Sequence, residues 1–203
     1  MKSTTSVLAA ALLLAFAPAH AAPPLVIFGL PLAAPLSMPQ CSYQRLDSST
    51  IFYNPPAEGS CYQISSANGR TELRPNDSVI IAWSVDSAPQ LASSGEASVQ
   101  LVDGNVEGIG FNTLGVMSQQ RDLQALVSKF GQPTTLKNLT MGNLMGATVQ
   151  VVMAEWKTAD GVQVSYNAAE DGFGKGLVSI DTVKGLAYEH AELMKLTQKS
   201  TPL

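Results

Sequence analysis

The sequence predicts an α+β fold in which hairpins build an antiparallel β-sheet. One central amphipathic helix is expected to pack on a face of this sheet, with a C-terminal helix and a Pro-rich, disulfide-stapled N-terminal arm. Three observations predict this class. Asp-Gly dipeptides at 103–104 and 160–161 each separate two strand-like runs, and this dipeptide favours tight hairpin turns. An apolar stripe with helical spacing lies between the two hairpins. Eight prolines in residues 22–78 nearly exclude regular helix there.

The first twenty-one residues predict a cleavable secretory signal. Lys2 supplies a positive start, an apolar run follows over 7–17, and Ala19 and Ala21 form the small-residue exit. The run is too short to span a bilayer, which needs about 20 apolar residues. We therefore expect cleavage after Ala21 and a mature periplasmic or secreted protein without a membrane span. The alanine-rich signal is typical of bacteria.

The rest of the chain divides into two predicted parts. Residues 22–78 form the arm and residues 79–203 form the α+β domain. Because the prolines of the arm break helices, we expect extended structure there, with short strands at 25–30, 50–53 and 61–64.

Cys41 and Cys61 are the only cysteines of the chain. Export would place them in an oxidising compartment, where a single disulfide is their natural pairing. A redox-active pair would usually have the spacing C-x-x-C, so we expect a structural bond. Closing this loop contributes roughly 3 kcal/mol to stability in the chain-entropy model.

The domain begins with a buried strand at 79–85, a run of β-branched and aromatic residues. The elements expected after it are strands at 98–102 and 106–113, a helix at 118–130, strands at 148–157, 162–168 and 177–182, and a helix at 186–199. Short links between the strands predict antiparallel pairing.

The helix at 118–130 has the clearest pattern. Its apolar stripe consists of Leu123, Leu126, Val127 and Phe130. Ser118 is expected to cap its start, and Gly131 and Pro133 are expected to end it. This helix and the segment Lys129-Phe130-Gly131-Gln132-Pro133-Thr134 before a hairpin resemble small envelope proteins of the β-lactamase-inhibitor and outer-membrane-assembly type. The resemblance covers about a third of the chain, implies a similar fold and transfers no site residue.

Charge and composition exclude several classes of partner. The formal net charge is −4 and becomes −4 − 1 = −5 once Lys2 is removed with the signal. Such a chain is a poor ligand for nucleic acid or anionic lipid. Charged residues make up only 14% of the chain, against roughly 25% in typical domains. We therefore expect a partner to be recognised by shape and neutral hydrogen bonds.

Few residues are available for catalysis. Removal of His20 with the signal leaves His190 as the only histidine, which gives little scope for a triad or a histidine metal site. The chain contains no G-x-S-x-G, H-E-x-x-H, Walker or G-x-G-x-x-G motif. We expect no catalytic residue, no metal and no cofactor. The alternative is a hydrolase that uses carboxylates such as Glu170 and Asp171.

The sequence therefore predicts a non-catalytic binding or interaction module of the cell envelope, such as an inhibitor, with another envelope or extracellular protein as its partner. The candidate partner contacts are Tyr43, Phe52, Tyr53 and Tyr62 around the cysteines, and Phe173 and Lys175 in the Gly-rich loop 170–176. One alternative is the carboxylate-dependent hydrolase, acting on cell-envelope glycan. Another is a structural component of a surface assembly, in which residues 22–40 add a strand to a neighbour. The oligomeric state is left open.

Overall fold

The structure is a computed structural model. It describes residues 24–47, 50–65, 69–142, 146, 148–171 and 173–199. The predicted signal, residues 1–21, lies outside these ranges. Within them, neither helix combines the length and the apolar character that crossing a bilayer requires.

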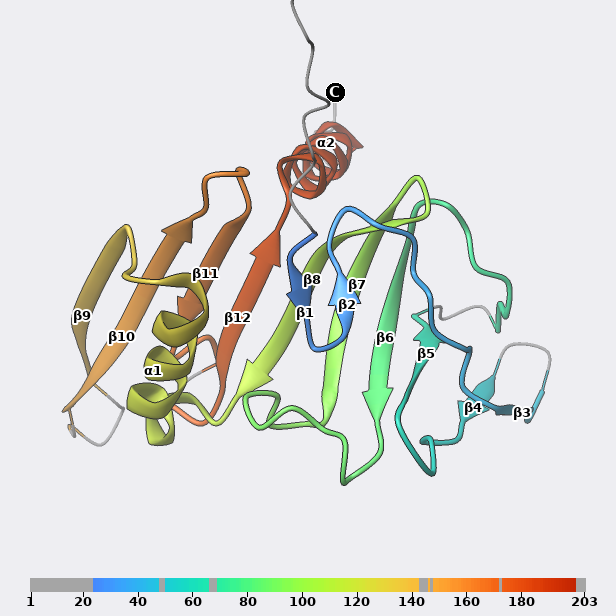
Figure 1. The fold of residues 1–203 in the computed structure, drawn as a ribbon, viewed down its shortest axis with the longest axis horizontal. Coiled ribbons are helices and arrows are strands. Elements are labelled where there is room, and N and C mark those ends of the chain that lie inside the picture. The colour runs from blue at the N-terminus through green and yellow to red at the C-terminus, as the bar shows by residue number, and fades with distance from the viewer. Residues whose placement is uncertain are drawn as a thin grey trace, which may run out of the picture.

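The fold is α+β and mostly antiparallel, with an eight-stranded sheet, two helices and one disulfide. The strands lie in the order β5-β6-β7-β8-β12-β11-β10-β9 (Figure 1). Their bounds are β5 Ser60–Ile64, β6 Asp77–Trp83, β7 Glu96–Val102, β8 Asn105–Thr113, β9 Thr135–Gly142, β10 Thr148–Lys157, β11 Gln163–Asn167 and β12 Gly176–Asp181.

The first predicted hairpin is confirmed as β7 and β8, joined by Asp103 and Gly104. Both turn residues have positive φ angles, of 52° and 79°, which a two-residue hairpin turn of this kind requires. The second, β10 with β11, is also confirmed. Its turn includes Gly161 with a φ of 84°. Local turn chemistry therefore placed both hairpins correctly.

Helix α1 (Gln119–Phe130) has Ser118 at its N-cap position, as expected, but the side chain does not cap the helix. The Ser118 hydroxyl makes no capping bond; it donates to the buried carboxylate of Asp122 at 2.5 Å. The apolar stripe packs against the core. The contacts of α1 with the sheet are made with β10, towards one end of the sheet.

Strand β9 is absent from the sequence prediction. Its residues alternate poorly, because Leu136 and Leu139 are three residues apart. The strand lies at the edge of the sheet and is mostly exposed on both faces. Burial therefore imposes no period of two on its sequence, and periodicity is the signal by which a strand is recognised.

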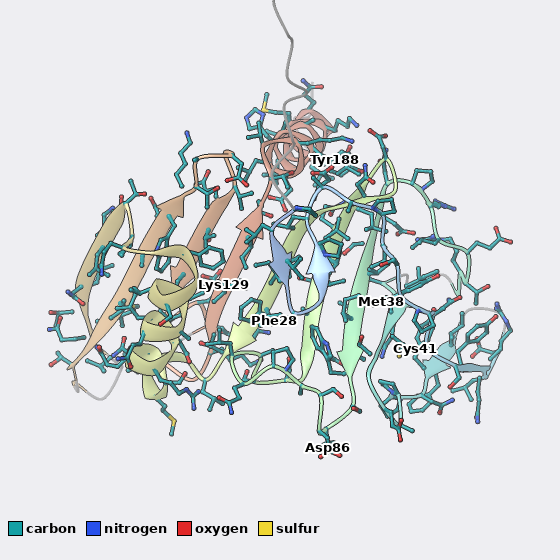
Figure 2. All side chains as sticks on the ribbon, viewed as in Figure 1. Phe28, Met38, Cys41, Asp86, Lys129 and Tyr188 are labelled. Carbon is teal, nitrogen blue, oxygen red and sulfur yellow. A yellow bond between two sulfur atoms is a disulfide. The ribbon has the colours of Figure 1, made fainter. Side chains whose placement is uncertain are left out.

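The beginning of the arm folds onto its own sheet. A single strand was expected at 25–30, but the chain forms a hairpin of β1 (Val26–Ile27) and β2 (Leu30–Pro31). Phe28 and Gly29 turn the chain with positive φ angles. Phe28, which is labelled in Figure 2, lies over the sheet. Its ring packs edge-on against that of Phe111, with ring centroids 4.9 Å apart. This hairpin lies on the same face of the sheet as α1 (Figure 1).

The rest of the arm contributes one strand to the large sheet and forms one separate hairpin. Strand β3 (Tyr43–Arg45) pairs with β4 (Ile51–Tyr53) in a small separate hairpin. Strand β5 pairs with β6 inside the eight-stranded sheet, so residue 79, where the domain was expected to begin, lies within β6. The largest fully buried side chains are Tyr166, Ile27, Leu30, Ile81, Leu101, Ile109, Leu126, Ile180, Val79, Val99, Val106 and Val151.

Helix α2 (Val183–Lys199) stands at one end of the sheet and is seen nearly end-on in Figure 1. It begins three residues earlier than expected because Thr182 caps it: the Thr182 hydroxyl accepts a hydrogen bond from the N–H of Gly185 at 3.0 Å. The N–H of Thr182 in turn donates to the carbonyl of Glu107 at 2.9 Å. These bonds attach the first turn of α2 to β8.

The predicted disulfide is present between Cys41 and Cys61, whose Cα atoms are 4.9 Å apart. It packs with Ala82 and Tyr53. Replacing both cysteines with serine should lower the free energy of unfolding by about 2–4 kcal/mol, because the unfolded chain regains loop entropy. Urea titration of the double variant measures this loss. Reduced wild-type protein is the control and should show the same loss; a change below about 0.5 kcal/mol in both would contradict the prediction.

Candidate binding surface

One face of the sheet is covered by α1 and the β1–β2 hairpin, and the opposite face is the open face. Along β6, β7, β8 and β12, alternate residues point to it because successive side chains of a strand point to opposite faces. In these strands many residues of the open face are small or neutral and polar, with Ile80 and Leu177 beside them: Ser78, Ser98, Gln100, Gly108, Gly110 and Ser179. In the described part of the chain, α2 contacts β7, β8 and β12 at one end of the sheet.

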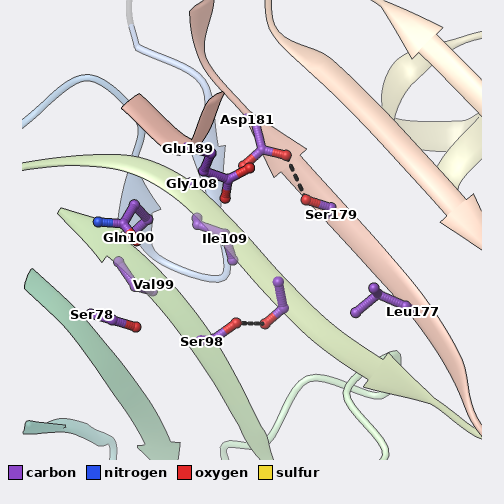
Figure 3. A pocket seen from close by; sticks show the side chains of 11 residues that line it. Ser78, Ser98, Val99, Gln100, Gly108, Ile109, Leu177, Ser179, Asp181 and Glu189 are labelled. Carbon is purple, nitrogen blue, oxygen red and sulfur yellow. Dashed lines mark hydrogen bonds between the residues drawn. The ribbon is translucent and has the colours of Figure 1, made fainter. Parts of the chain in front are cut away.

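A groove of about 280 Å³ lies on the open face (Figure 3). Its floor comes from β6, β7, β8 and β12, and Glu189 of α2 stands at its border. Ser98 donates from its hydroxyl to the carbonyl of Gly110 at 3.1 Å across the β7–β8 pair. We call this feature the Asp181 groove, after the carboxylate at the end of β12 that lines it.

The groove exists because two residues on its floor lack side chains. A Cβ at Gly110 would lie 2.9 Å from the hydroxyl oxygen of Ser98. A Cβ at Gly108 would lie 2.6 Å from a carboxylate oxygen of Asp181. Side chains at these two positions would therefore fill the floor and displace the polar groups that line it.

Asp181 is the most perturbed acid of this surface. Asp181 is 8% exposed. The hydroxyl of Ser179 donates a hydrogen bond to the Asp181 carboxylate at 2.5 Å (Figure 3). Burial raises the pKa of Asp181 to about 6, although the bond from Ser179 lowers it; the negative charge of Glu189 raises it further. The carboxyl group therefore takes up a proton just below neutral pH.

This raised pKa predicts a pH-dependent stability. The pKa of Asp181 is about 6 in the folded chain and near 3.8 when unperturbed, so the folded chain binds the proton more tightly. The free energy of unfolding should fall as the pH rises between these values. Asp181→Asn cannot ionise, so it should be about 1–3 kcal/mol more stable than wild type at pH 7.5.

The measurement is urea unfolding of wild type and Asp181→Asn at pH 7.5 and pH 4. The advantage of the variant should be mostly lost at pH 4, because the wild-type carboxyl is then protonated in the folded chain and close to half protonated in the unfolded chain. Ser128→Ala, at an exposed position of α1 on the opposite side of the sheet, should show no such pH-dependent difference. An equal difference at both pH values would rule out the raised pKa as its cause.

Helix α2 stands beside the groove, and Glu189 is the residue of α2 that lines it. Gly185, Glu189, Glu192 and Leu196 have the spacing of one helix side, and this side includes the residue that borders the groove. Further along the helix, Leu193 and Leu196 are 62% and 63% exposed. Leucines exposed to this extent close together on one helix are typical of a surface that contacts another molecule.

A second depression continues the open face towards β9. It has a volume of about 220 Å³ and is lined by residues of β9 to β12 and of the loop after β11. Leu177 of β12 lines both this depression and the Asp181 groove. The two hollows therefore lie next to each other on the open face, with Leu177 between them.

The predicted aromatic contacts lie away from this path, at the β3–β4 hairpin and β5. The rings of Tyr43 and Tyr53 stack edge-on with centroids 5.8 Å apart. Tyr53 packs against the disulfide, and its hydroxyl accepts a bond from the N–H of Ile64 at 3.3 Å. Tyr62 packs against the core, whereas Phe52 is exposed. This group therefore covers the disulfide on one side and meets solvent on the other.

The predicted loop contacts lie elsewhere, between β11 and β12. Phe173 is half-buried and packs against the core, and its carbonyl accepts a bond from the N–H of Val116 at 3.1 Å. Lys175 is exposed. Glu170 accepts a bond from the Asn167 amide at 2.9 Å. The fold thus does not bring the loop residues and the aromatic residues to one site.

The Asp181 groove was missed in the sequence, although a signal for it exists. Glycines alternate with Ile109 in β8, and Ser179 and Asp181 alternate with Ile180 in β12. Small or polar residues on one face of two central strands indicate a hollow once the strands are known to be neighbours. In the described residues, no group of three or more His, Cys, Asp and Glu side chains is arranged to hold a metal ion.

The class that fold and surface define is an α+β domain with one covered and one open sheet face. Comparison of the chain with protein-family models, with curated proteins and with solved structures found no match.

Proposed function

We propose that this protein is an exported, non-catalytic binding module of the cell envelope. Its partner is another envelope or extracellular protein, held in the corner between the open face and α2. The observation that carries the proposal is the Asp181 groove, whose floor of small polar residues is bordered by a helix that exposes Leu193 and Leu196.

The chemistry of the corner fits a polypeptide segment. Protein interfaces combine an apolar centre with polar groups that form hydrogen bonds. Here the leucines of α2 supply apolar contact, and the hydroxyl and amide groups of Ser78, Ser98 and Gln100 supply hydrogen bonds. None of the described residues that line the groove is positively charged, so a nucleic acid or phosphate ligand is poorly matched to it.

The location outside the cytoplasm is supported by two independent features. The disulfide between Cys41 and Cys61 is typical of oxidising compartments. The first twenty-one residues have the charged start, apolar middle and small-residue exit of a secretory signal. A partner would therefore be met in the periplasm or outside the cell.

The proposal is tested by site-specific photo-cross-linking in the producing cells. A photoreactive phenylalanine analogue is placed at Ser98 in the groove and, separately, at Leu193 on α2. The matched control places it at Val85, which is 94% exposed on the loop after β6. We expect the same partner protein to be trapped from the first two positions and not from the control. Adducts that do not differ from those of Val85 would contradict the proposal.

A carboxylate-dependent hydrolase is the second candidate, and one observation favours it. Asp181, with its pKa raised to about 6, shares the groove with Glu189. Glycosidases use one carboxyl group that stays protonated and one that is ionised. Activity on cell-envelope glycan that is lost in both Asp181→Asn and Glu189→Gln, with folding intact, would favour this candidate. Absence of wild-type activity across a panel of such glycans would exclude it.

A further inference from the structure

The two edges of the eight-stranded sheet differ in whether another segment of the described chain bonds to them. The β5 edge is covered: the N–H of Tyr62 donates to the carbonyl of Pro39 at 3.0 Å, and the N–H of Cys41 donates to the carbonyl of Tyr62 at 2.8 Å. The β9 edge has no such cover within the described part of the chain. A bare strand edge is a template for pairing with another strand.

The hydrogen bonds of β10 show which backbone groups of β9 face outwards. The N–H of Val152 donates to the Gln119 side chain at 3.0 Å, and its carbonyl accepts from Ala168 at 3.0 Å. Both groups of Val152 therefore point away from β9. Residues directly opposite each other in an antiparallel pair share this orientation, and Val152 lies opposite Asn138. The backbone groups of Asn138 thus point to the free edge.

Alternation along the strand extends this result. The residues of β9 whose backbone N–H and C=O groups face outwards are Leu136, Asn138, Thr140 and Gly142. The intervening residues Thr135, Lys137, Leu139 and Met141 bond inwards to β10. The outward set spans seven residues and is symmetric about Leu139.

Few side chains of β9 would hinder the pairing of another strand at this edge. Leu136, Leu139 and Met141 are 50%, 42% and 37% exposed. Lys137 is the only charged residue of the strand, and the strand contains no proline. Edge strands that avoid association usually carry several charges, a proline or a bulge, and the register of β9 with β10 is continuous.

We propose that β9 pairs antiparallel with β9 of a second copy of this chain, about a two-fold axis at Leu139. In this register Leu136 lies opposite Gly142 and Asn138 opposite Thr140 of the second copy, so all four outward residues find partners. Four hydrogen-bonded pairs with two bonds each would form. The two eight-stranded sheets become one continuous sheet.

Charge disfavours registers that are centred on or near Lys137. Lys137 lies opposite Met141 of the second copy, so the two lysines are separated by four register positions, or about 13 Å along the strands. Moving the axis to Lys137 would place the two lysines directly opposite each other, which is destabilising. An axis at Leu139 instead places two leucines at the closest, non-hydrogen-bonded position. From the sequence, residues 22–40 were the segment expected to add a strand to a neighbouring molecule. In this proposal the strand that pairs with the neighbour is β9.

The first test is a cysteine cross-link. Leu139→Cys places two thiols at a position where opposed Cα atoms lie about 4.5 Å apart, within the range of a disulfide. We expect a covalent dimer to form under mild oxidation. The control is Leu136→Cys, whose two copies would lie about 20 Å apart in the same register. Equal cross-linking of both variants, or none of Leu139→Cys, would overturn the proposed register.

The second test is the mass in solution, measured by analytical ultracentrifugation of the oxidised chain. Wild type should be a dimer, and Leu139→Lys and Leu139→Glu should each be monomers, because like charges meet on the axis. Mixing the two variants should restore a dimer. Asn138→Pro, which removes an outward N–H and no bond to β10, should also be monomeric. Circular dichroism verifies that the variants are folded.

The mass of the wild-type chain decides the proposal. A wild-type chain that stays monomeric at about 100 µM would overturn it, because any dimer would then have a Kd weaker than about 100 µM. So would a dimer that persists in Leu139→Lys, Leu139→Glu and Asn138→Pro. The photo-cross-links from Ser98 and Leu193 do not depend on this edge, so they should be unchanged in Leu139→Lys.

Discussion

Trp156→Ala should lower the free energy of unfolding by about 3–5 kcal/mol, the loss typical of a large buried aromatic residue. Trp156 is 2% exposed. Its ring centroid lies 6.4 Å from that of Phe130, and its indole N–H donates to the carbonyl of Gly131 at 2.8 Å. The side chain therefore joins β10 to the end of α1, and its removal should loosen both.

Trp156→Phe separates packing from hydrogen bonding. It retains an aromatic ring and loses the bond to the carbonyl of Gly131, so its cost should be about 1–2 kcal/mol. Urea unfolding followed by circular dichroism measures both variants. A loss of less than about 1 kcal/mol in Trp156→Ala would mean that the indole does not join α1 to the sheet.

Gly185→Ala should destabilise the protein by about 2–4 kcal/mol and displace the first turn of α2. A Cβ at this position would overlap the carbonyl oxygen of Glu107 and lie 2.9 Å from the carbonyl carbon. Both atoms belong to the backbone of β8 and cannot swing aside. Helix propensity alone predicts the opposite sign, a gain of about 1 kcal/mol.

The sign of this change is therefore a direct test of how α2 meets the sheet. Urea unfolding gives the stability, and hydrogen exchange of the α2 amides reports the displacement. Gly174→Ala is the matched control, because a Cβ there meets no atom within 4 Å. A stabilising Gly185→Ala would show that α2 does not approach β8 as closely as the structure has it. Displacement of α2 should also weaken the photo-cross-link from Leu193.

Local chemistry made several parts of the fold predictable. The turn at Asp103 and Gly104 follows from the freedom of glycine at positive φ. The apolar stripe of α1 follows from the helical period. The disulfide follows from two cysteines in a chain with a predicted export signal. In each case the residues that decide the structure lie close together in the sequence or have a single partner available.

Strand β9 and the Asp181 groove illustrate the opposite case. Leu136 and Leu139 lie on an edge strand that is bonded only on one side, so no burial pattern marks it. Glu189 and Asp181 share a groove because α2 turns back across the end of β12. Which hydrophobic residues are left exposed depends on where the neighbouring elements end, and the sequence carries no local record of this.

The sequence by itself determined the α+β class, both hairpins, the helix at α1 and the disulfide, because turn geometry, periodicity and thiol pairing act over short distances or between unique partners. Only the tertiary structure decided which sheet face is open, that Gly185 contacts the backbone of Glu107, and that the β9 edge is bare. These features arise from strand order, and strand order is set by contacts between residues far apart in the chain.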